Sequence, residues 1–403
     1  MKFSGSIDFS PKIVSALRHY SAARFKSDLI AGIVVGIVAL PLAIAFGIAS
    51  GVSPTVGLTT AIIGGFIVSA LGGNSVQIGG PTGAFIIIVY SIIQQYGLEG
   101  LGVATFMAGV MLVGMGLFHL GTVIKFIPYP IVVGFTAGIA LTIFSTQIND
   151  FFGLGLSDVP GAFISKWGVY FEHLGDISWT TLAVGIVSLA IIVLTPRISK
   201  RLPGALMAIV VVTAGVALLH SVFPDFAVET IGDRFGDMET DLPAPQAFNW
   251  DMEVINNLMP WAFTIAVLAA IESLLSATVA DGVTGSHTNS NTELIGQGAA
   301  NMVVPFFGGI PVTGAIARTM TNISNGGRTP VAGVIHAAVL LLIFLFAMPL
   351  INHVPMACLA AVLIVEYERL AHTDSHIPHA SQRYLRAACN FLPDGNLRPD
   401  YSH

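Results

Sequence analysis

Long apolar runs separated by short polar stretches constrain this chain more than any other feature. A helix needs about 20 mostly apolar residues to cross the roughly 30 Å of hydrocarbon in a bilayer, and several runs are that long. Only 10% of the residues are charged and the mean hydropathy is +0.79, whereas a soluble domain carries about a quarter charged residues. The sequence therefore predicts an all-α polytopic membrane protein.

The apolar runs number twelve, and two of them are too short to span. They lie near 29–50, 54–72, 82–95, 100–120, 128–148, 178–195, 203–223, 257–280, 293–308, 314–324, 330–349 and 353–365. The third and the tenth cannot cross the hydrocarbon as helices. We therefore expect interrupted spans at these two places.

Charges between the runs predict the orientation of the chain, because Lys and Arg concentrate in cytoplasmic connections. A cytoplasmic N-terminal segment, 1–28, leaves the acidic loop 224–256 outside. The same start places these basic residues inside: Lys125, Arg197, Lys200, Arg201 and Arg328. We expect a multi-pass protein of the inner (plasma) membrane with a cytoplasmic N-terminus.

Composition and motifs argue against several other classes. The net charge of -6 gives no reason to expect a nucleic-acid partner, and Cys358 and Cys389 form neither a disulfide framework nor a metal motif. The sequence contains no HExxH, nucleophile-elbow or phosphate-loop motif. We expect no enzymatic activity, no cofactor and no metal, with the lipid bilayer as the surroundings.

A short motif occurs twice. Thr-Gly-Ala at 82–84 recurs at 313–315, an offset of 313 - 82 = 231 residues. The first copy lies at the start of the third predicted run and the second at the start of the tenth, seven runs later. Because seven is odd, the two copies run in opposite directions through the membrane. Inverted repeats of this kind build many transporters, and short interrupted spans at matching positions point to the substrate site.

Each interrupted span is predicted to begin a helix inside the membrane. Such a start leaves backbone N–H groups unpaired and partially positive, so they must face a polar cavity or an anion. Thr82 and Thr313 are the expected caps, and Gly83 and Gly314 leave the backbone open to close approach. Ordinary bends or tight helix packing would explain the same residues.

Two charged residues lie in apolar surroundings near these starts. Arg318 follows the second start and is expected to hold an oxyanion with its planar guanidinium, or else to form a structural ion pair. Glu272, in the run 257–280, is expected to carry a coupling proton or to bind Na⁺ with Ser273 and Ser276. The alternative for Glu272 is a fixed counter-charge to Arg318.

Four further polar residues are expected to lie outside the substrate and coupling sites or at the edge of the cavity. Asp281 is expected to be a solvated helix-end charge, and His119 and His336 are expected to serve packing or interfaces. Gln77, just before the first repeated motif, is a candidate for lining the cavity.

Two stretches carry a resemblance to a known family. NTELIGQGAANMVVPFFGGIPVTGAIARTMTNISNGGRTPVAG, 291–333, and IVALPLAIAFGIASGVSPTVGL, 37–58, are similar to the sulfate permease (SulP) family of anion transporters. The resemblance covers most of 25–365. It implies an inverted-repeat (7+7 type) transporter fold with half-helices at segments 3 and 10, a core domain that moves against a gate domain, and a homodimer.

The resemblance also implies a site. On this chain the anion site is lined by Gly80, Thr82, Gly83, Ala84, Thr313, Gly314, Ala315 and Arg318, and the ion-coupling residues are Glu272, Ser273 and Ser276. Some family members carry a glutamate after the proline of segment one, where this chain has Leu42 after Pro41. We therefore expect Glu272 to be the main coupling residue.

The end of the chain departs from the family pattern. The transmembrane domain is predicted at 29–365, cut short after segment 12, and the polar tail 366–403 is expected to be unrelated to the family, without a STAS domain. The abrupt change indicates truncation or a shifted reading frame.

The predicted function is secondary active transport of small inorganic oxyanions by alternating access. The expected substrate is sulfate, with H⁺ or Na⁺ as the coupling ion. The alternatives are Na⁺-dependent bicarbonate symport, a passive anion channel and a truncated chain that does not transport.

Overall fold

The computed structural model describes residues 9–372 except 19, 123–128, 157–158, 161–162, 200–202, 224–225, 237–242 and 249. The orientation predictions that use Lys125, Lys200 and Arg201, parts of the loop 224–256, and residues 373–403 of the predicted tail lie outside the described residues.

The N-terminal half is almost entirely helical. Its elements are α1 (Lys12–Arg18), α2 (Ala22–Ala49), α3 (Pro54–Leu71), β1 (Gly79–Gly80), η1 (Gly83–Phe85), α4 (Ile86–Leu117), η2 (Leu120–Thr122), α5 (Tyr129–Phe152), α6 (Phe163–Glu172), η4 (Leu174–Asp176), α7 (Trp179–Ile198) and α8 (Gly204–Val222). The C-terminal half has the same character. Its elements are α9 (Ile231–Phe235), α10 (Met252–Thr284), α11 (Ser290–Val303), η5 (Val304–Phe307), β2 (Thr313–Gly314), α12 (Ile316–Ser324), α13 (Val331–Ile351) and α14 (Met356–His372).

The helices confirm the polytopic all-α class. In the described part, seven are long and apolar enough to cross a bilayer: α2, α3, the stretch Gly83–Leu117, α7, α8, α10 and α13. The third and fourth predicted runs join in α4, whose backbone breaks at Gly97 (φ 69°, ψ -175°). Helix α12 has nine residues, about 14 Å at the helical rise, so the tenth run does not span, as predicted.

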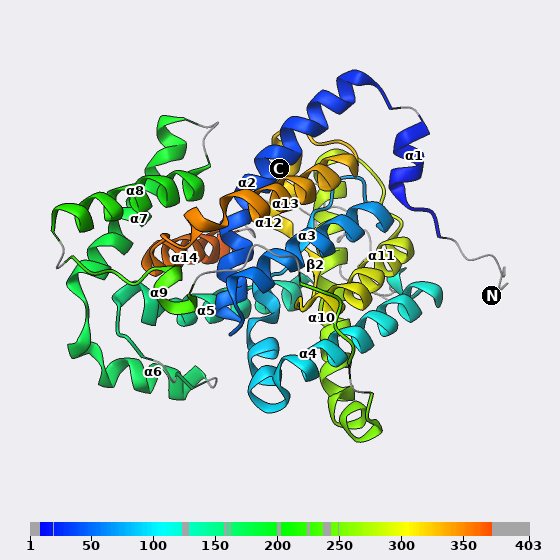
Figure 1. Cartoon of the computed structure of the whole chain (residues 1–403). Coiled ribbons are helices and arrows are strands. Elements are labelled where there is room, and N and C mark those ends of the chain that lie inside the picture. Colours follow the sequence, from blue (N-terminus) through cyan, green and yellow to red (C-terminus); the bar gives the residue numbers. More distant parts are fainter. Residues whose placement is uncertain are drawn as a thin grey trace, which may run out of the picture.

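Two groups of helices form the molecule, as Figure 1 shows. The core group contains α2–α4 and α10–α13, with α4 packed on α10 and α11 and with α13 packed on α2 and α3. The gate group contains α5–α9 and α14, with α14 packed on α5 and α7. The gate group lies on the left of the view, beside the core group.

Buried carboxylates fasten the ends of the core helices to one another. Asp28 is fully buried and accepts hydrogen bonds from the hydroxyl of Thr329 (2.6 Å) and from the backbone of Arg328 (2.9 Å). Glu293 is also fully buried and accepts from the backbone N–H groups of Gly73 (2.8 Å) and Asn74 (2.9 Å). Because a buried charge is costly unless it is hydrogen-bonded, these contacts fix the connections of the core group.

The two interrupted spans meet in the core group. Strands β1 and β2 pair antiparallel, with Gly79 opposite Gly314 and Gly80 opposite Thr313, and the N–H of Ala315 donates to the carbonyl of Ile78 (2.9 Å). Extended backbone inside a membrane must satisfy its own polar groups. The two stretches do so by pairing with each other, and helices α4 and α12 then start from this crossing.

Candidate functional site

A cavity of about 50 Å³ lies beside the crossing of the two interrupted spans. Both helix groups line it, because Ile139 of α5 and Glu366 of α14 face the core residues across the space. The lining residues are Leu42, Phe46, Thr82, Gly83, Ala84, Ile139, Glu272, Leu275, Ala315, Ile316, Ala317, Arg318 and Glu366. We call this space the central cavity.

The helix starts at the central cavity have no side-chain caps. The residue before η1 is Thr82 and the residue before α12 is Ala315, and neither side chain accepts a hydrogen bond from its helix. The prediction that Thr82 and Thr313 cap these helices is therefore wrong. Thr82 occupies the position before η1, but its hydroxyl donates to Glu272 instead (2.9 Å). Thr313 lies in β2, paired with Gly80 and two residues before Ala315, the residue that precedes α12. The first N–H groups of α12 belong to Ile316 and Ala317, which line the cavity, and such groups attract anions.

Arg318 is the most deeply buried charge at the site, with 1% of its surface exposed. Its Nη2 donates to the carbonyl oxygen of Pro81 (2.9 Å). Its Nε and Nη1 have no hydrogen-bond partner in the described part of the chain. Unpaired buried donors cost free energy, more so when they are charged, and this guanidinium leaves two such donors unused by the described residues.

Gly80 provides the space that Arg318 occupies. A Cβ atom added at Gly80 would lie 2.0 Å from Nη1 of Arg318. The first interrupted span therefore positions the guanidinium of the second, both by this close approach and through the Pro81 carbonyl.

Glu272 reaches the same cavity from α10. Its Oε2 accepts a hydrogen bond from the hydroxyl of Thr82 (2.9 Å). The ion pairs found among the described residues join Arg234 to Asp150 and to Glu229, and none joins Glu272 to Arg318. Glu272 thus contacts the first helix start rather than neutralising the arginine directly.

Ser273 and Ser276 lie behind the cavity rather than in its lining. The hydroxyls of Ser273 and Thr313 are 2.6 Å apart, and the N–H of Gly314 donates to the Ser273 hydroxyl (3.2 Å). The Ser276 hydroxyl lies 3.5 Å from that of Thr319. Both serines therefore attach the second interrupted span to α10.

The predicted open backbone at Gly83 and Gly314 is used by protein side chains. A Cβ atom at Gly83 would lie 2.2 Å from Cδ1 of Ile143 in α5. One at Gly314 would lie 1.4 Å from Nε2 of Gln77, which donates to the carbonyl of Ser273 (3.2 Å). Gly83 permits close contact with the gate group, and Gln77 supports the crossing and is absent from the cavity lining.

Glu366 is a lining residue that sequence reasoning missed. It lies on α14, is 6% exposed and adds a second carboxylate to the cavity. The apolar run ends at residue 365, so the sequence alone suggests that Glu366 marks the polar end of a span. The available signal was the helix-compatible sequence EYERL that continues from it.

Asp281 and the two histidines lie away from the cavity. Asp281 accepts hydrogen bonds from the Ser286 hydroxyl (2.9 Å) and from the backbone N–H of Thr288 (2.8 Å), which confirms its place at a helix end. His336 is fully buried in α13. His119 is exposed, and its Nδ1 lies 2.9 Å from the side-chain amide of Asn291.

Comparison with protein families gives one model over most of the chain. The sulfate permease family model matches residues 25–382, which includes residues beyond the boundary predicted at 365. The chain is 47% identical over 365 residues to "Putative sulfate transporter YvdB" of Bacillus subtilis, covering 91% of this chain and 66% of that protein. It is 32% identical over 316 residues to the bicarbonate transporter BicA of Synechocystis sp., covering 76% of this chain and 54% of BicA. The chain thus covers less than two thirds of the length of each of these relatives.

Solved structures share the fold. The transmembrane domain of a cyanobacterial BicA matches with a TM-score of 0.78 at 30% identity, covering 87% of this chain and 90% of that one. The murine anion transporter Slc26a9 matches with a TM-score of 0.80 at 18% identity, covering 96% of this chain and 67% of that one. These domains have the inverted-repeat fold, so the predicted fold class is confirmed.

Proposed function

This chain belongs to the sulfate permease family, and on that premise we propose that it is a secondary active transporter of small inorganic oxyanions. The anion occupies the central cavity between the starts of η1–α4 and α12. Alternating access moves the core group against the gate group, because residues of both groups line the cavity.

One observation carries this proposal: Arg318 is buried inside the cavity with two donors unpaired in the described part of the chain. A planar guanidinium with adjacent free donors matches the oxygens of an oxyanion. The cavity volume of about 50 Å³ is sufficient for about four water molecules at roughly 10–15 Å³ each. A sulfate or bicarbonate ion has a comparable size, whereas a larger organic anion does not fit this conformation.

Coupling is proposed to pass through Glu272. With Arg318 and Glu272 both ionised, the carboxylate cancels the charge of the guanidinium, +1 - 1 = 0, and so opposes the entry of an anion. Protonation of Glu272, or a Na⁺ ion bound beside it, removes this opposition. Binding of the driving ion and binding of the anion thereby favour each other.

Sulfate remains the first candidate substrate, supported by the similarity to YvdB. Bicarbonate is the second candidate because of the similarity to BicA in sequence and structure. Uptake of labelled sulfate and of labelled bicarbonate, each with and without Na⁺ and with an inward proton gradient, separates the two.

Arg318 provides the test of the site. The purified chain in liposomes should take up the preferred anion, and Arg318→Gln should lower the rate about 100-fold, because it removes two charged hydrogen bonds of at least about 1.5 kcal/mol each. Arg328→Gln is the matched control, since Arg328 is exposed outside the cavity. Uptake by Arg318→Gln at the rate of this control would refute the proposed site.

The setting of the transporter is part of the proposal. We place it in the plasma membrane with a cytoplasmic N-terminus and as a homodimer. The first follows from the charges of the connecting segments and the second from the family resemblance.

A further inference from the structure

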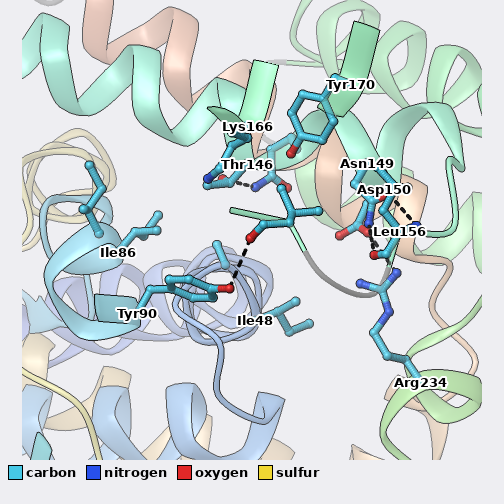
Figure 2. A pocket seen from close by; sticks show the side chains of 14 residues that line it. Ile48, Ile86, Tyr90, Thr146, Asn149, Asp150, Leu156, Lys166, Tyr170 and Arg234 are labelled. Carbon is cyan, nitrogen blue, oxygen red and sulfur yellow. Dashed lines mark hydrogen bonds and ion pairs between the residues drawn. The ribbon is translucent and has the colours of Figure 1, made fainter. Parts of the chain in front are cut away.

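A second and larger cavity, of about 210 Å³, lies between the core group and the gate group (Figure 2). Its lining comes from the end of α2, the first turns of α4, the last turns of α5, and from α6 and α9. The acidic-loop orientation places this end of α5 on the outer side of the membrane. We call this space the outer cavity.

The outer cavity continues the central cavity along the same three helical segments. On α2 the lining passes from Phe46 in the central cavity to Ile48 in the outer one. From Ala84 it passes to Tyr90, and on α5 from Ile139 to Thr146. The steps from one lining to the other cover between two and seven residues, or about 3 to 10 Å of helix. The two cavities therefore lie next to each other along these segments, between the two helix groups.

Lys166 is a charged lining residue of the outer cavity that no described residue pairs with. It is half-buried, and in the described part of the chain it makes no hydrogen bond and no ion pair. Burial lowers the pKa of its ammonium group, with no opposing contribution from a carboxylate. Partly buried charges are normally paired, and no carboxylate among the described residues pairs with this one.

Tyr170 lies one helical turn beyond Lys166 on the same face of α6. Its hydroxyl also makes no hydrogen bond to another described residue. Figure 2 shows Lys166, Thr146 and Tyr170 grouped on one side of the outer cavity. The opposite face of α6 is apolar and exposed, with Ile164 at 86% and Phe171 at 65%, so Lys166 lies on the face of α6 that is turned toward the outer cavity.

The other cation of the outer cavity is already paired. Arg234 donates to Glu229 (2.8 and 2.5 Å) and to Asp150 (2.9 Å). Figure 2 places Asp150 and Arg234 together on the side away from Lys166. An anion in the outer cavity would therefore be held at the Lys166 side, where the positive charge is not neutralised.

We infer that the outer cavity is a second binding site for a small oxyanion, held by the ammonium of Lys166 and the hydroxyl of Tyr170. The transported anion occupies this second site as it moves between the solution and Arg318. This inference rests on the proposed transport function. It adds a site, since a single central site gives Lys166 no role in transport.

The test uses the purified full chain and inorganic sulfate and bicarbonate as probes. Equilibrium binding of the transported anion in detergent without phospholipid should give two ions per chain for the wild type. It should give one for Lys166→Met and two for Lys166→Arg. In liposomes, Lys166→Met should raise KM about tenfold and leave the maximal rate within about twofold, while Lys166→Arg stays near the wild type.

The outcomes separate this inference from the proposed function. If the wild type neither binds nor transports either anion, the proposed function fails and the outer site fails with it. If the wild type transports but binds one ion, and Lys166→Met matches it in binding and KM, the outer site alone is refuted. A lipid phosphate offers the same chemistry as the free anion. A Lys166 effect that appears only in liposomes containing anionic lipid would assign the cavity to a headgroup and overturn the inference.

Discussion

The two interrupted spans share an architecture but not a chemistry. The first contributes uncharged hydrogen-bonding partners for charged side chains of other segments. The carbonyl of Pro81 accepts a hydrogen bond from Arg318, and the hydroxyl of Thr82 donates one to Glu272. The second contributes the cation itself, and its Thr313 hydroxyl is occupied by α10, where it bonds to Ser273 and to the carbonyl of Ala269. Two spans of similar backbone architecture thus carry one charged side chain between them, Arg318.

The two interrupted spans also differ in the helices that they contact. The second span is fastened within the core group by Ser273, at Thr313 and at Gly314. The first span contacts the gate group, since Gly83 lies against Ile143 of α5. We infer that the second span holds the anion and that the first transmits contact between the two helix groups.

Among the variants that compare the two spans, the largest expected effect comes from removing the space that the first span leaves for the charge of the second. Gly80→Ala places a methyl carbon 2.0 Å from Nη1 of Arg318, so the buried guanidinium must shift. A misplacement of about 1 Å at a reacting or binding group can cost about 100-fold in rate. We expect anion uptake in liposomes to fall about 10- to 100-fold.

Gly114→Ala is the matched control, since a Cβ atom at Gly114 meets nothing within 4 Å. Equal uptake by the two alanine variants would show that the first span does not position Arg318.

The next effect separates binding of the anion at Arg318 from coupling of its transport to a driving ion through Glu272. Glu272→Gln keeps a side chain that can accept the Thr82 hydrogen bond but cannot release or bind a proton. A proton gradient of one unit, coupled one to one, supports about tenfold accumulation, and the variant should accumulate nothing while still exchanging internal for external anion. Counterflow of labelled anion measures the exchange.

Glu253→Gln serves as the control, because Glu253 is exposed at the start of the same helix. Proton- or sodium-driven accumulation that persists in Glu272→Gln would assign coupling to another group.

The smallest expected effect is on stability, and it compares the attachments of the two spans. Ser273→Ala removes the hydroxyl that contacts Thr313 and Gly314 in a fully buried place. Leaving such groups unsatisfied costs about 1–3 kcal/mol. Thr82→Val removes one bond at the cavity, where water can replace it. We expect thermal unfolding in detergent to show a lower midpoint for Ser273→Ala than for Thr82→Val. The reverse order would mean that the first span is the more firmly attached one.

The features that the sequence reveals are those in which a residue conflicts with its surroundings. An apolar run of 11 residues (314–324) cannot span, and Arg318 and Glu272 are charges in apolar segments, so the interrupted spans and the two charges were predictable. The pairing of Gly80 with Thr313 was not. The offset of 231 aligned two similar motifs, whereas strand register depends on contacts between distant segments.

Two other residues gave no such conflict. Glu366 comes directly after an apolar run, where a charge is ordinary, and its burial is visible only once α14 lies across the cavity. Lys166 stands in a connection between runs, and only the packing of α6 shows that none of the described residues pairs with it. In both cases the information lies in tertiary contacts rather than in local composition.

The most direct measurement is an experimental structure of the chain with bound selenate, whose selenium can be located by anomalous scattering. We predict one selenate in the central cavity, with oxygens within hydrogen-bonding distance of Nε and Nη1 of Arg318 and near the first N–H groups of α12. A central cavity without selenate at concentrations that saturate transport, or a selenate that leaves both nitrogens of Arg318 unpaired, would contradict the claim that the two interrupted spans form the anion site.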